Sequence, residues 1–93
     1  KNKKNAQLDY DKIQFPITYR NYSEGDSFSP LGMRNQKKVS SYISDIKLNY
    51  LDKIHQLVLE DNKNNIVWLV GQQISDKYKV DNYTKKILNL EII

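Results

Sequence analysis

A cluster of basic residues lies in the stretch GDSFSPLGMRNQKK, which covers positions 25–38. Its members are Arg34, Lys37 and Lys38. They lead into residues 36–46, where apolar residues recur at i, i+3, i+4 and i+7, the spacing of one helical face. We predict a helix there, with Asn35 as its N-cap. Free backbone amides at a helix start, together with adjacent cations, can bind a phosphate group.

The position of these cations is unusual for a helix. Lysines in the first turn oppose the helix dipole, which costs some tenths of a kcal/mol each. Local rules that are broken in this way often mark functional sites. The alternative is that lysines exposed to salt solution cost little and have no function. The residues alone leave both interpretations open.

The sequence contains few residues that could carry catalysis. His55 is the only histidine, and we interpret it as a surface residue. Asp76 and Asp81 could form an acid–base pair in principle, but aspartate is common in turns. The three glycines never have the spacing of a phosphate-binding loop, and the absence of cysteine excludes disulfides and thiolate zinc sites. We therefore predict no catalytic site, no metal site and no cofactor in this chain.

The excess positive charge lies in the first half of the 93 residues. Residues 1–47 hold nine Lys or Arg against five Asp or Glu, whereas residues 48–93 hold six against six. A bias of this size permits nucleic-acid binding, although many soluble domains share it. The longest apolar stretch, residues 66–70, is too short to span a membrane. Together with the lack of cysteine, this agrees with a cytoplasmic location.

The hydrophobic pattern predicts a small α+β domain with mostly antiparallel strands and one main helix. Residues 8–20 alternate and indicate one or two strands, interrupted at Pro16. The segments QLVLED and NIVWLVG, joined by an Asn-rich turn, predict a hairpin. We also expect a short helical turn after Asn49 and a closing strand within residues 84–93.

Residues 1–19 begin with the polar run KNKKNAQ, which has no apolar face. We predict that they form a linker or the end of a preceding region, and that residues 20–93 form the domain. Aromatic residues at apolar periodic positions are expected in the core, while Tyr22 and Tyr50, beside turns, stay open for base stacking. The expected core aromatics are Tyr19, Tyr42, Tyr78 and Trp68.

One long segment, residues 20–48, closely resembles the start of the C-terminal domain of bacterial tRNA(Ile)-lysidine synthetase. The likeness continues downstream in IVWLVGQQISDKYKV and covers about residues 20–93. This chain departs from the family pattern at Asn49 and Lys53, and at Gln73, where the family often has Arg. The matching residues are Arg20, Asn21, Gly25, Asp26, Phe28, Pro30, Gly32, Met33, Lys37 and Lys38.

The resemblance implies a fold related to a domain of the phenylalanyl-tRNA synthetase β subunit. It also implies a parent ligase that uses ATP and Mg²⁺ to attach lysine to the wobble cytidine of tRNA(Ile). Catalysis would lie in an N-terminal domain with its own phosphate loop, which has no counterpart here. This domain would hold the acceptor-stem side of the tRNA, with tRNA(Ile) and the N-terminal domain as its partners.

The predicted tRNA contacts follow from the basic cluster. We expect Arg34, Lys37 and Lys38 to contact phosphates, with Arg20 and Asn35 next. Asp26 is expected to be structural, because a carboxylate repels phosphate; it would cap a turn or pair with Arg20. The alternative is a protein-interaction or scaffolding domain that never touches RNA. The loop residues expected to support the cations are Gly25, Phe28, Pro30, Gly32 and Met33.

Overall fold

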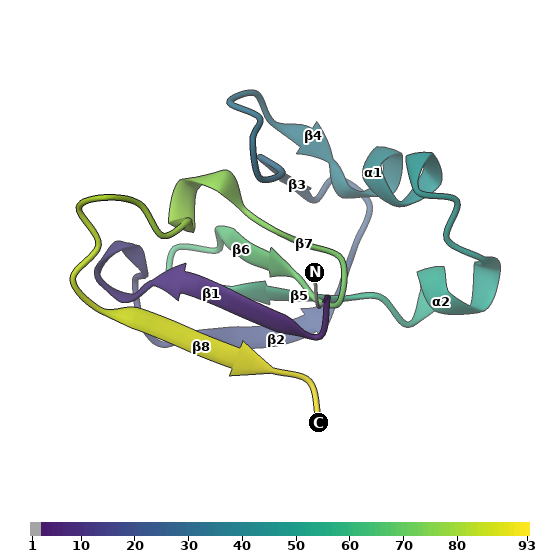
Figure 1. Cartoon of the computed structure of the whole chain (residues 1–93). Coiled ribbons are helices and arrows are strands. Elements are labelled where there is room, and N and C mark those ends of the chain that lie inside the picture. The colour runs from purple at the N-terminus through teal and green to yellow at the C-terminus, as the bar shows by residue number, and fades with distance from the viewer. Residues whose placement is uncertain (1–2) are drawn as a thin grey trace.

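The computed structural model describes residues 3–93 and shows an α+β arrangement of three antiparallel sheets and two short helices (Figure 1). The predicted fold class is confirmed. The strands are β1 (Asn5–Asp9), β2 (Thr18–Asn21), β3 (Ser27–Phe28), β4 (Lys37–Lys38), β5 (Leu57–Glu60), β6 (Ile66–Leu69), β7 (Gln73–Ile74) and β8 (Ile87–Glu91). The helices are α1 (Val39–Asp45) and α2 (Tyr50–Ile54), and two 3-10 turns are η1 (Tyr10–Lys12) and η2 (Asp76–Tyr78).

The central sheet has the strand order β2-β5-β6-β7, and both of its faces are covered. The β1–β8 pair packs on one face, where Leu8 meets Val67 and Trp68 in one apolar cluster. On the other face, Phe28 and residues of α1 form a second cluster with Val58 and Leu69. Every residue of β6 is therefore buried, as expected for a strand between two layers.

The predicted hairpin and the predicted second helical turn are both confirmed. β5 and β6 pair antiparallel on either side of the Asn-rich turn. The Asn49 side chain caps α2, because its oxygen accepts a hydrogen bond from the backbone N–H of Asp52 at 2.9 Å. The closing strand is β8. No helix in the described residues is long and apolar enough to cross a membrane.

The segment that begins the chain differs from its interpretation as a tail. Residues 1 and 2 lie outside the described residues, but residues 5–9 form β1, paired along its whole length with β8. Ala6 and Leu8 alternate with polar neighbours and are buried. Two apolar residues at period two are enough to bury one face of a strand that has a partner. A domain boundary at residue 19 in a longer protein stays a prediction.

The start of the main helix also differs from its prediction. Lys37 and Lys38 are extended in β4, the helix begins at Val39, and Lys38 is its N-cap without a side-chain cap bond. Pairing of β4 with β3 keeps the two lysines out of the helical conformation. Asn35 is therefore not the N-cap, and the cations do not lie in the first helical turn.

The aromatic residues divide by whether a second layer covers their face. Trp68 and Tyr78 are buried, and Tyr42 packs partly against the second cluster, as predicted. Tyr19 is 73% exposed, so its predicted core position is wrong. It lies on β2, an edge strand, where alternation predicts the face of a side chain but not whether another layer covers it.

Tyr78 makes a buried hydrogen bond that predicts a specific pH dependence. Its hydroxyl donates to Asp61 Oδ2 at 3.0 Å. Burial, and then the adjacent carboxylate, raise the pKa of Tyr78 to about 12 from 10.0. Tyr78 thus stabilises the fold below about pH 10, and this contribution is lost as the pH rises towards 12. We expect Tyr78→Phe to lower the free energy of unfolding by about 1–2 kcal/mol at pH 7.

Urea denaturation of both proteins at pH 7 and at pH 10.5 checks this prediction. The difference in free energy of unfolding between wild type and Tyr78→Phe should be smaller at the higher pH. Only wild type has the Tyr78 hydroxyl, so only wild type loses its contribution as the pH rises. Tyr83→Phe is the matched control, since Tyr83 is 88% exposed. A gap of the same size at both pH values would contradict the assignment.

Candidate nucleic-acid interface

The basic cluster lies on a β-hairpin, residues 27–38, formed by β3 and β4. Ser27 pairs with Lys38 and Phe28 with Lys37, so residues 29–36 form the connecting loop. Phe28 is buried against the second apolar cluster and holds the base of the hairpin. In Figure 1 the hairpin stands beside β7 and the turn that follows it. The loop is thus supported at its base and along one side.

Backbone hydrogen bonds attach the loop to β7 and η2. Leu31 N–H donates to the carbonyl oxygen of Ile74 at 3.2 Å, and Asp76 N–H donates to that of Ser29 at 2.7 Å. Pro30 and Ser75 form an isolated bridge between these bonds. The loop therefore has a defined conformation before any ligand binds.

Asp76 completes this attachment with its side chain. Its Oδ1 accepts a hydrogen bond from Gly32 N–H at 3.0 Å, and Gly32 has a φ of 89°, which favours glycine. The Gly32 bond lowers the pKa of Asp76, and Lys79, 3.1 Å away, contributes less. Asp81 instead accepts from Lys12 at 2.8 Å. The two aspartates have separate structural partners.

Arg20 is held in an internal network at the base of the hairpin. Its guanidinium donates to both carboxylate oxygens of Asp26, at 2.9 and 3.0 Å, and to Glu60 Oε1 at 3.0 Å. Asp26 also accepts from the backbone N–H of Ser23 at 2.7 Å. The bond from Arg20 holds the pKa of Asp26 below its usual range. The expected pairing of Asp26 with Arg20 is confirmed, and this geometry favours a structural role for Arg20.

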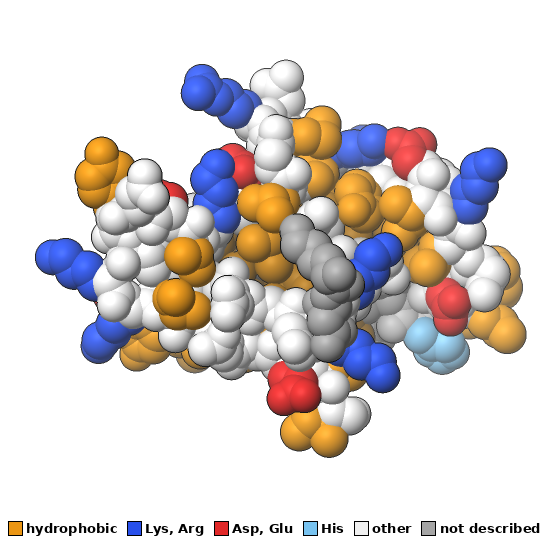
Figure 2. Space-filling view, in the orientation of Figure 1, with side chains coloured by type: hydrophobic (Ala, Val, Ile, Leu, Met, Phe, Trp, Pro, Cys, Tyr) orange, Lys and Arg blue, Asp and Glu red, His pale blue; other side chains and the backbone are white. Residues whose placement is uncertain are grey.

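The remaining predicted contacts differ in how free their side chains are. Lys37 is half-buried and forms an ion pair with Asp45 at the end of α1. Arg34, Asn35 and Lys38 are exposed, and their side chains make no hydrogen bond or ion pair within residues 3–93. A basic side chain projects at the upper edge of Figure 2, in the region where Figure 1 draws the loop of the hairpin. The hairpin thus presents to solvent one amide and two cations without a close ion pair, and the charge of Arg34 also helps to lower the pKa of Asp76.

The supporting residues behave as expected, with one exception. Phe28 and Pro30 are buried, but Met33 is 43% exposed and supports the loop only through its backbone N–H, which donates to Pro30 at 2.8 Å. Sequence reasoning missed the role of Asp76, because its contact with Gly32 joins residues 44 positions apart. The SD pair at positions 75–76 was the only available signal, because both residue types are common in turns.

His55 is exposed and follows α2, away from the hairpin. Among the described residues, no group of three or more His, Cys, Asp or Glu side chains is placed to hold a metal ion.

Several known proteins with similar sequences carry the name tRNA(Ile)-lysidine synthase. The chain is 43% identical over 88 residues to a tRNA(Ile)-lysidine synthase of Parabacteroides distasonis, covering 95% of this chain and 20% of that protein. It is 40% identical over 91 residues to the enzyme of that name from Clostridium acetobutylicum, covering 98% of this chain and 20% of the relative. The chain therefore spans about a fifth of the length of these relatives. No family model matches it.

Solved structures share the fold at low sequence identity. A crystal structure of the TilS C-terminal domain matches with a TM-score of 0.79 and 16% identity, covering 100% of this chain and 74% of the other. An N-terminal fragment of the phenylalanyl-tRNA synthetase β subunit from Pyrococcus horikoshii matches with a TM-score of 0.76 and 21% identity, covering 91% of this chain and 26% of the other. The chain is thus homologous to a segment of the tRNA(Ile)-lysidine synthases and has the fold of a TilS C-terminal domain.

Proposed function

We propose that this chain is the tRNA-binding C-terminal domain of a cytoplasmic tRNA(Ile)-lysidine synthetase. The parent enzyme would be an ATP-dependent ligase that attaches lysine to the wobble cytidine of tRNA(Ile). Its N-terminal domain would bind ATP and Mg²⁺ and carry out catalysis, while this domain holds the acceptor-stem side of the tRNA. The names of the relatives and the shared fold support this assignment.

The observation that carries the proposal is the hairpin, which presents Arg34 and Lys38 exposed and without ion-pair partners in the described residues. Double-stranded RNA is recognised mainly through phosphates and 2′-hydroxyl groups, and these are the groups that such cations bind. Because the loop is already attached to Ile74 and Asp76, little ordering entropy is lost on binding.

The proposed contacts follow from the geometry of each side chain. Arg34 has the planar fork that matches a phosphate, whereas Lys38 acts as a point charge. Asn35 lies next to Arg34 and would donate its amide to a 2′-hydroxyl or phosphate oxygen. Lys37 would contribute less, because it shares its charge with Asp45. Arg20 would act indirectly, by holding Asp26 at the base of the hairpin.

The test measures the affinity of the chain for a tRNA(Ile) transcript and for a fully paired RNA hairpin at several salt concentrations. Each lost phosphate contact should flatten the log–log salt dependence by about one unit. We expect this flattening for Arg34→Ala and for Lys38→Ala, and a smaller effect for Lys37→Ala.

Lys85→Ala is the matched control, because Lys85 is an exposed lysine in the segment that leads into β8. It removes the same charge from outside the β-hairpin, so the salt dependence of RNA binding should change less than for Arg34→Ala and Lys38→Ala. Equal slopes for wild type, Arg34→Ala and Lys38→Ala would remove the hairpin from the RNA interface.

A second candidate function is docking onto the N-terminal domain of the parent protein without RNA contact. The surface of α2 favours it, because Tyr50 is 73%, Leu51 65% and Ile54 47% exposed. The relatives are about five times as long as this chain, so a covering domain would be available. If this is the only function, all the cation variants should bind RNA as weakly as wild type does.

A further inference from the structure

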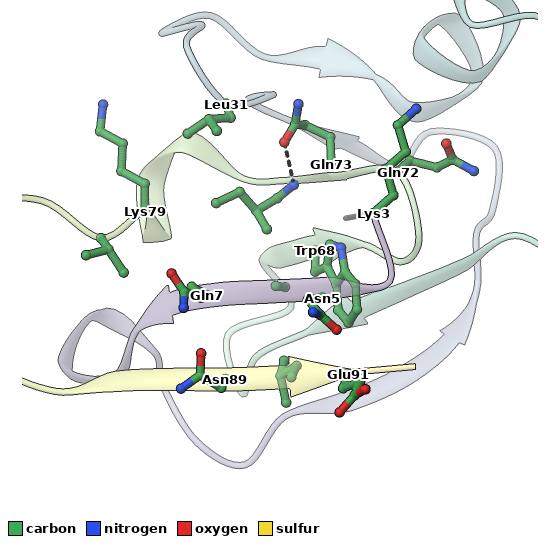
Figure 3. A pocket seen from close by; sticks show the side chains of 14 residues that line it. Lys3, Asn5, Gln7, Leu31, Trp68, Gln72, Gln73, Lys79, Asn89 and Glu91 are labelled. Carbon is green, nitrogen blue, oxygen red and sulfur yellow. Dashed lines mark hydrogen bonds between the residues drawn. The ribbon is translucent and has the colours of Figure 1, made fainter. Parts of the chain in front are cut away.

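A groove with a cavity volume of about 630 Å³ runs between β7 and the β1–β8 sheet (Figure 3). This volume is within the range of small-molecule sites. The apolar part of its lining includes Ala6, Trp68, Ile74 and Leu90. The hairpin also contributes, because Leu31 lines the groove three positions before Arg34. The groove is therefore continuous with the proposed RNA-binding loop.

The polar part of the lining is dominated by carboxamides. The side chains concerned are those of Asn5, Gln7, Gln72, Gln73 and Asn89. Only Gln73 has a hydrogen-bond partner within residues 3–93, since its Oε1 accepts from the backbone N–H of Ile74 at 3.2 Å. The buried Gln56, in contrast, donates to two carbonyl oxygens at 2.8 Å each. The groove thus offers several carboxamides whose donors and acceptors are not used by the fold.

Trp68 adds one more donor to the groove. Its side chain is only 5% exposed, yet its indole N–H has no hydrogen-bond partner in the described residues. Within residues 3–93, every side-chain nitrogen that is fully buried has a hydrogen-bond partner. The Trp68 N–H has none, so it must reach the groove surface. In Figure 3 the indole nitrogen lies on the β7 side of the groove. A ligand that enters the groove meets an unused donor on an otherwise apolar wall.

Charge at the groove favours an anionic ligand. Lys3 and Lys79 line it on opposite sides, as Figure 3 shows. Lys79 is held near Asp76, at 3.1 Å, beside the attachment point of the hairpin loop. Among the described residues, Glu91 is the only carboxylate in the lining; it is exposed and pairs with Asn5 across the two strands β1 and β8. Lys3 is placed to hold a phosphate on one side of a ligand seated in the groove, and Lys79 on the other side would contribute less, because it shares its charge with Asp76.

We propose that this groove binds an unpaired nucleotide of the RNA. Carboxamides form bidentate hydrogen bonds with base edges, and unpaired bases are recognised through such edges together with contacts to their flat faces. Here the amides and the Trp68 N–H read the edge, Leu31 and Ile74 contact the ring, and Lys3 and Lys79 hold the flanking phosphates. A paired stem cannot present a base edge to the floor of the groove. The inference rests on the proposed RNA-binding function, which it deepens.

Trp68 is the only tryptophan, so its fluorescence reports on the groove directly. The probes are single-stranded RNA hexanucleotides of each base, a fully paired RNA hairpin, and an extended polar hexapeptide. We expect a hexanucleotide to change the Trp68 emission, and the other two probes to leave it unchanged. Gln7→Ala/Gln72→Ala should weaken hexanucleotide binding about tenfold, because two hydrogen bonds to the base are lost.

Gln14→Ala is the matched control, because Gln14 is exposed and does not line the groove. Hexanucleotide binding that is unaffected by Gln7→Ala/Gln72→Ala, or emission that responds equally to the paired hairpin, would overturn the proposal. A response to the hexapeptide alone would overturn it in favour of a peptide site.

Failure of the groove and failure of the wider function are distinguishable. Arg34→Ala/Lys38→Ala should weaken binding of the fully paired RNA hairpin and leave the change in Trp68 emission with the hexanucleotide in place. If wild type does not bind the paired RNA but still responds to the hexanucleotide, the result would count only against the proposed contact with an RNA stem.

Discussion

Replacing Leu8 with alanine is expected to lower the free energy of unfolding by about 3–5 kcal/mol. Leu8 is completely buried between the β1–β8 pair and the central sheet, where it packs with Val67 and Trp68. The truncation loses the burial of the leucine side chain and leaves a cavity that surrounding side chains fill only in part. Small domains are stable by about 5–15 kcal/mol, so this single change removes a large share of the total.

Urea denaturation, followed by circular dichroism, measures the difference. Gln7→Ala is the matched control, because Gln7 is the exposed neighbour of Leu8 on the same strand. We expect it to change the free energy of unfolding by no more than about 0.5 kcal/mol. If the two variants were equally stable, β1 would not be part of the folded core, and residues 5–9 would behave as the linker that their polarity predicts.

Replacing Arg20 with alanine is expected to lower the free energy of unfolding by about 2–3 kcal/mol at pH 7. This is somewhat less than the loss on breaking a fully buried ion pair. The side chains of Asp26 and Glu60 are only 14% and 11% exposed, and the variant leaves their carboxylates without a cation. Arg20 itself is 36% exposed, so water entering its place limits the loss. Lys at this position should recover only part of the stability, because it lacks the fork that binds Asp26 and Glu60 together.

The effect of Arg20→Ala should depend on pH in a defined direction. In wild type, the bond from Arg20 lowers the pKa of Asp26, so the stabilisation is present above about pH 4 and is lost as the pH falls through the lowered pKa. In the variant, Asp26 lacks the bond from Arg20 and binds a proton more readily than in wild type. The difference in free energy of unfolding between wild type and Arg20→Ala should therefore be largest near pH 7 and should shrink as the pH falls below about 4. A difference that stays constant from pH 7 to well below pH 4 would show that the network contributes through packing rather than charge.

Those parts of the fold that depend on local pattern were accessible from the sequence. The β5–β6 hairpin follows from two apolar runs around an Asn-rich turn, and α2 follows from its Asn49 cap. Residues 5–9 were predicted as a linker but form the strand β1. Ala6 and Leu8 are the only apolar residues buried in this strand, and two alternating apolar residues are too weak a signal to predict its pairing with β8. Tyr19 shows the opposite error, because it was predicted to be buried and is exposed. Its alternation correctly predicts a strand, but no second layer covers this side chain on the edge strand β2.

The candidate interface was predictable in its location but not in its geometry. The cluster of cations predicted a binding role for this stretch of chain, and that role stays a prediction. The prediction of a helix start for Lys37 and Lys38 was wrong, because a two-residue strand pair has almost no sequence signal. The pairing of Lys37 with Asp45 and the attachment of Gly32 to Asp76 depend on tertiary contacts. The groove could not be predicted, because residues from both ends and the middle of the chain line it.

The way the 29–36 loop is attached has a consequence for how such domains can diversify. Leu31, Gly32 and Ser29 hold the loop through backbone atoms, and none of these bonds depends on the side chains at positions 33–36. Substitutions at positions 33–35 would therefore leave the path of the chain intact while changing the charge that it displays, whereas the Gln36 side chain accepts a hydrogen bond from Ser27 at 3.0 Å. Under the proposed function, related chains could thus adjust their attraction for RNA by single surface substitutions, at little cost to folding.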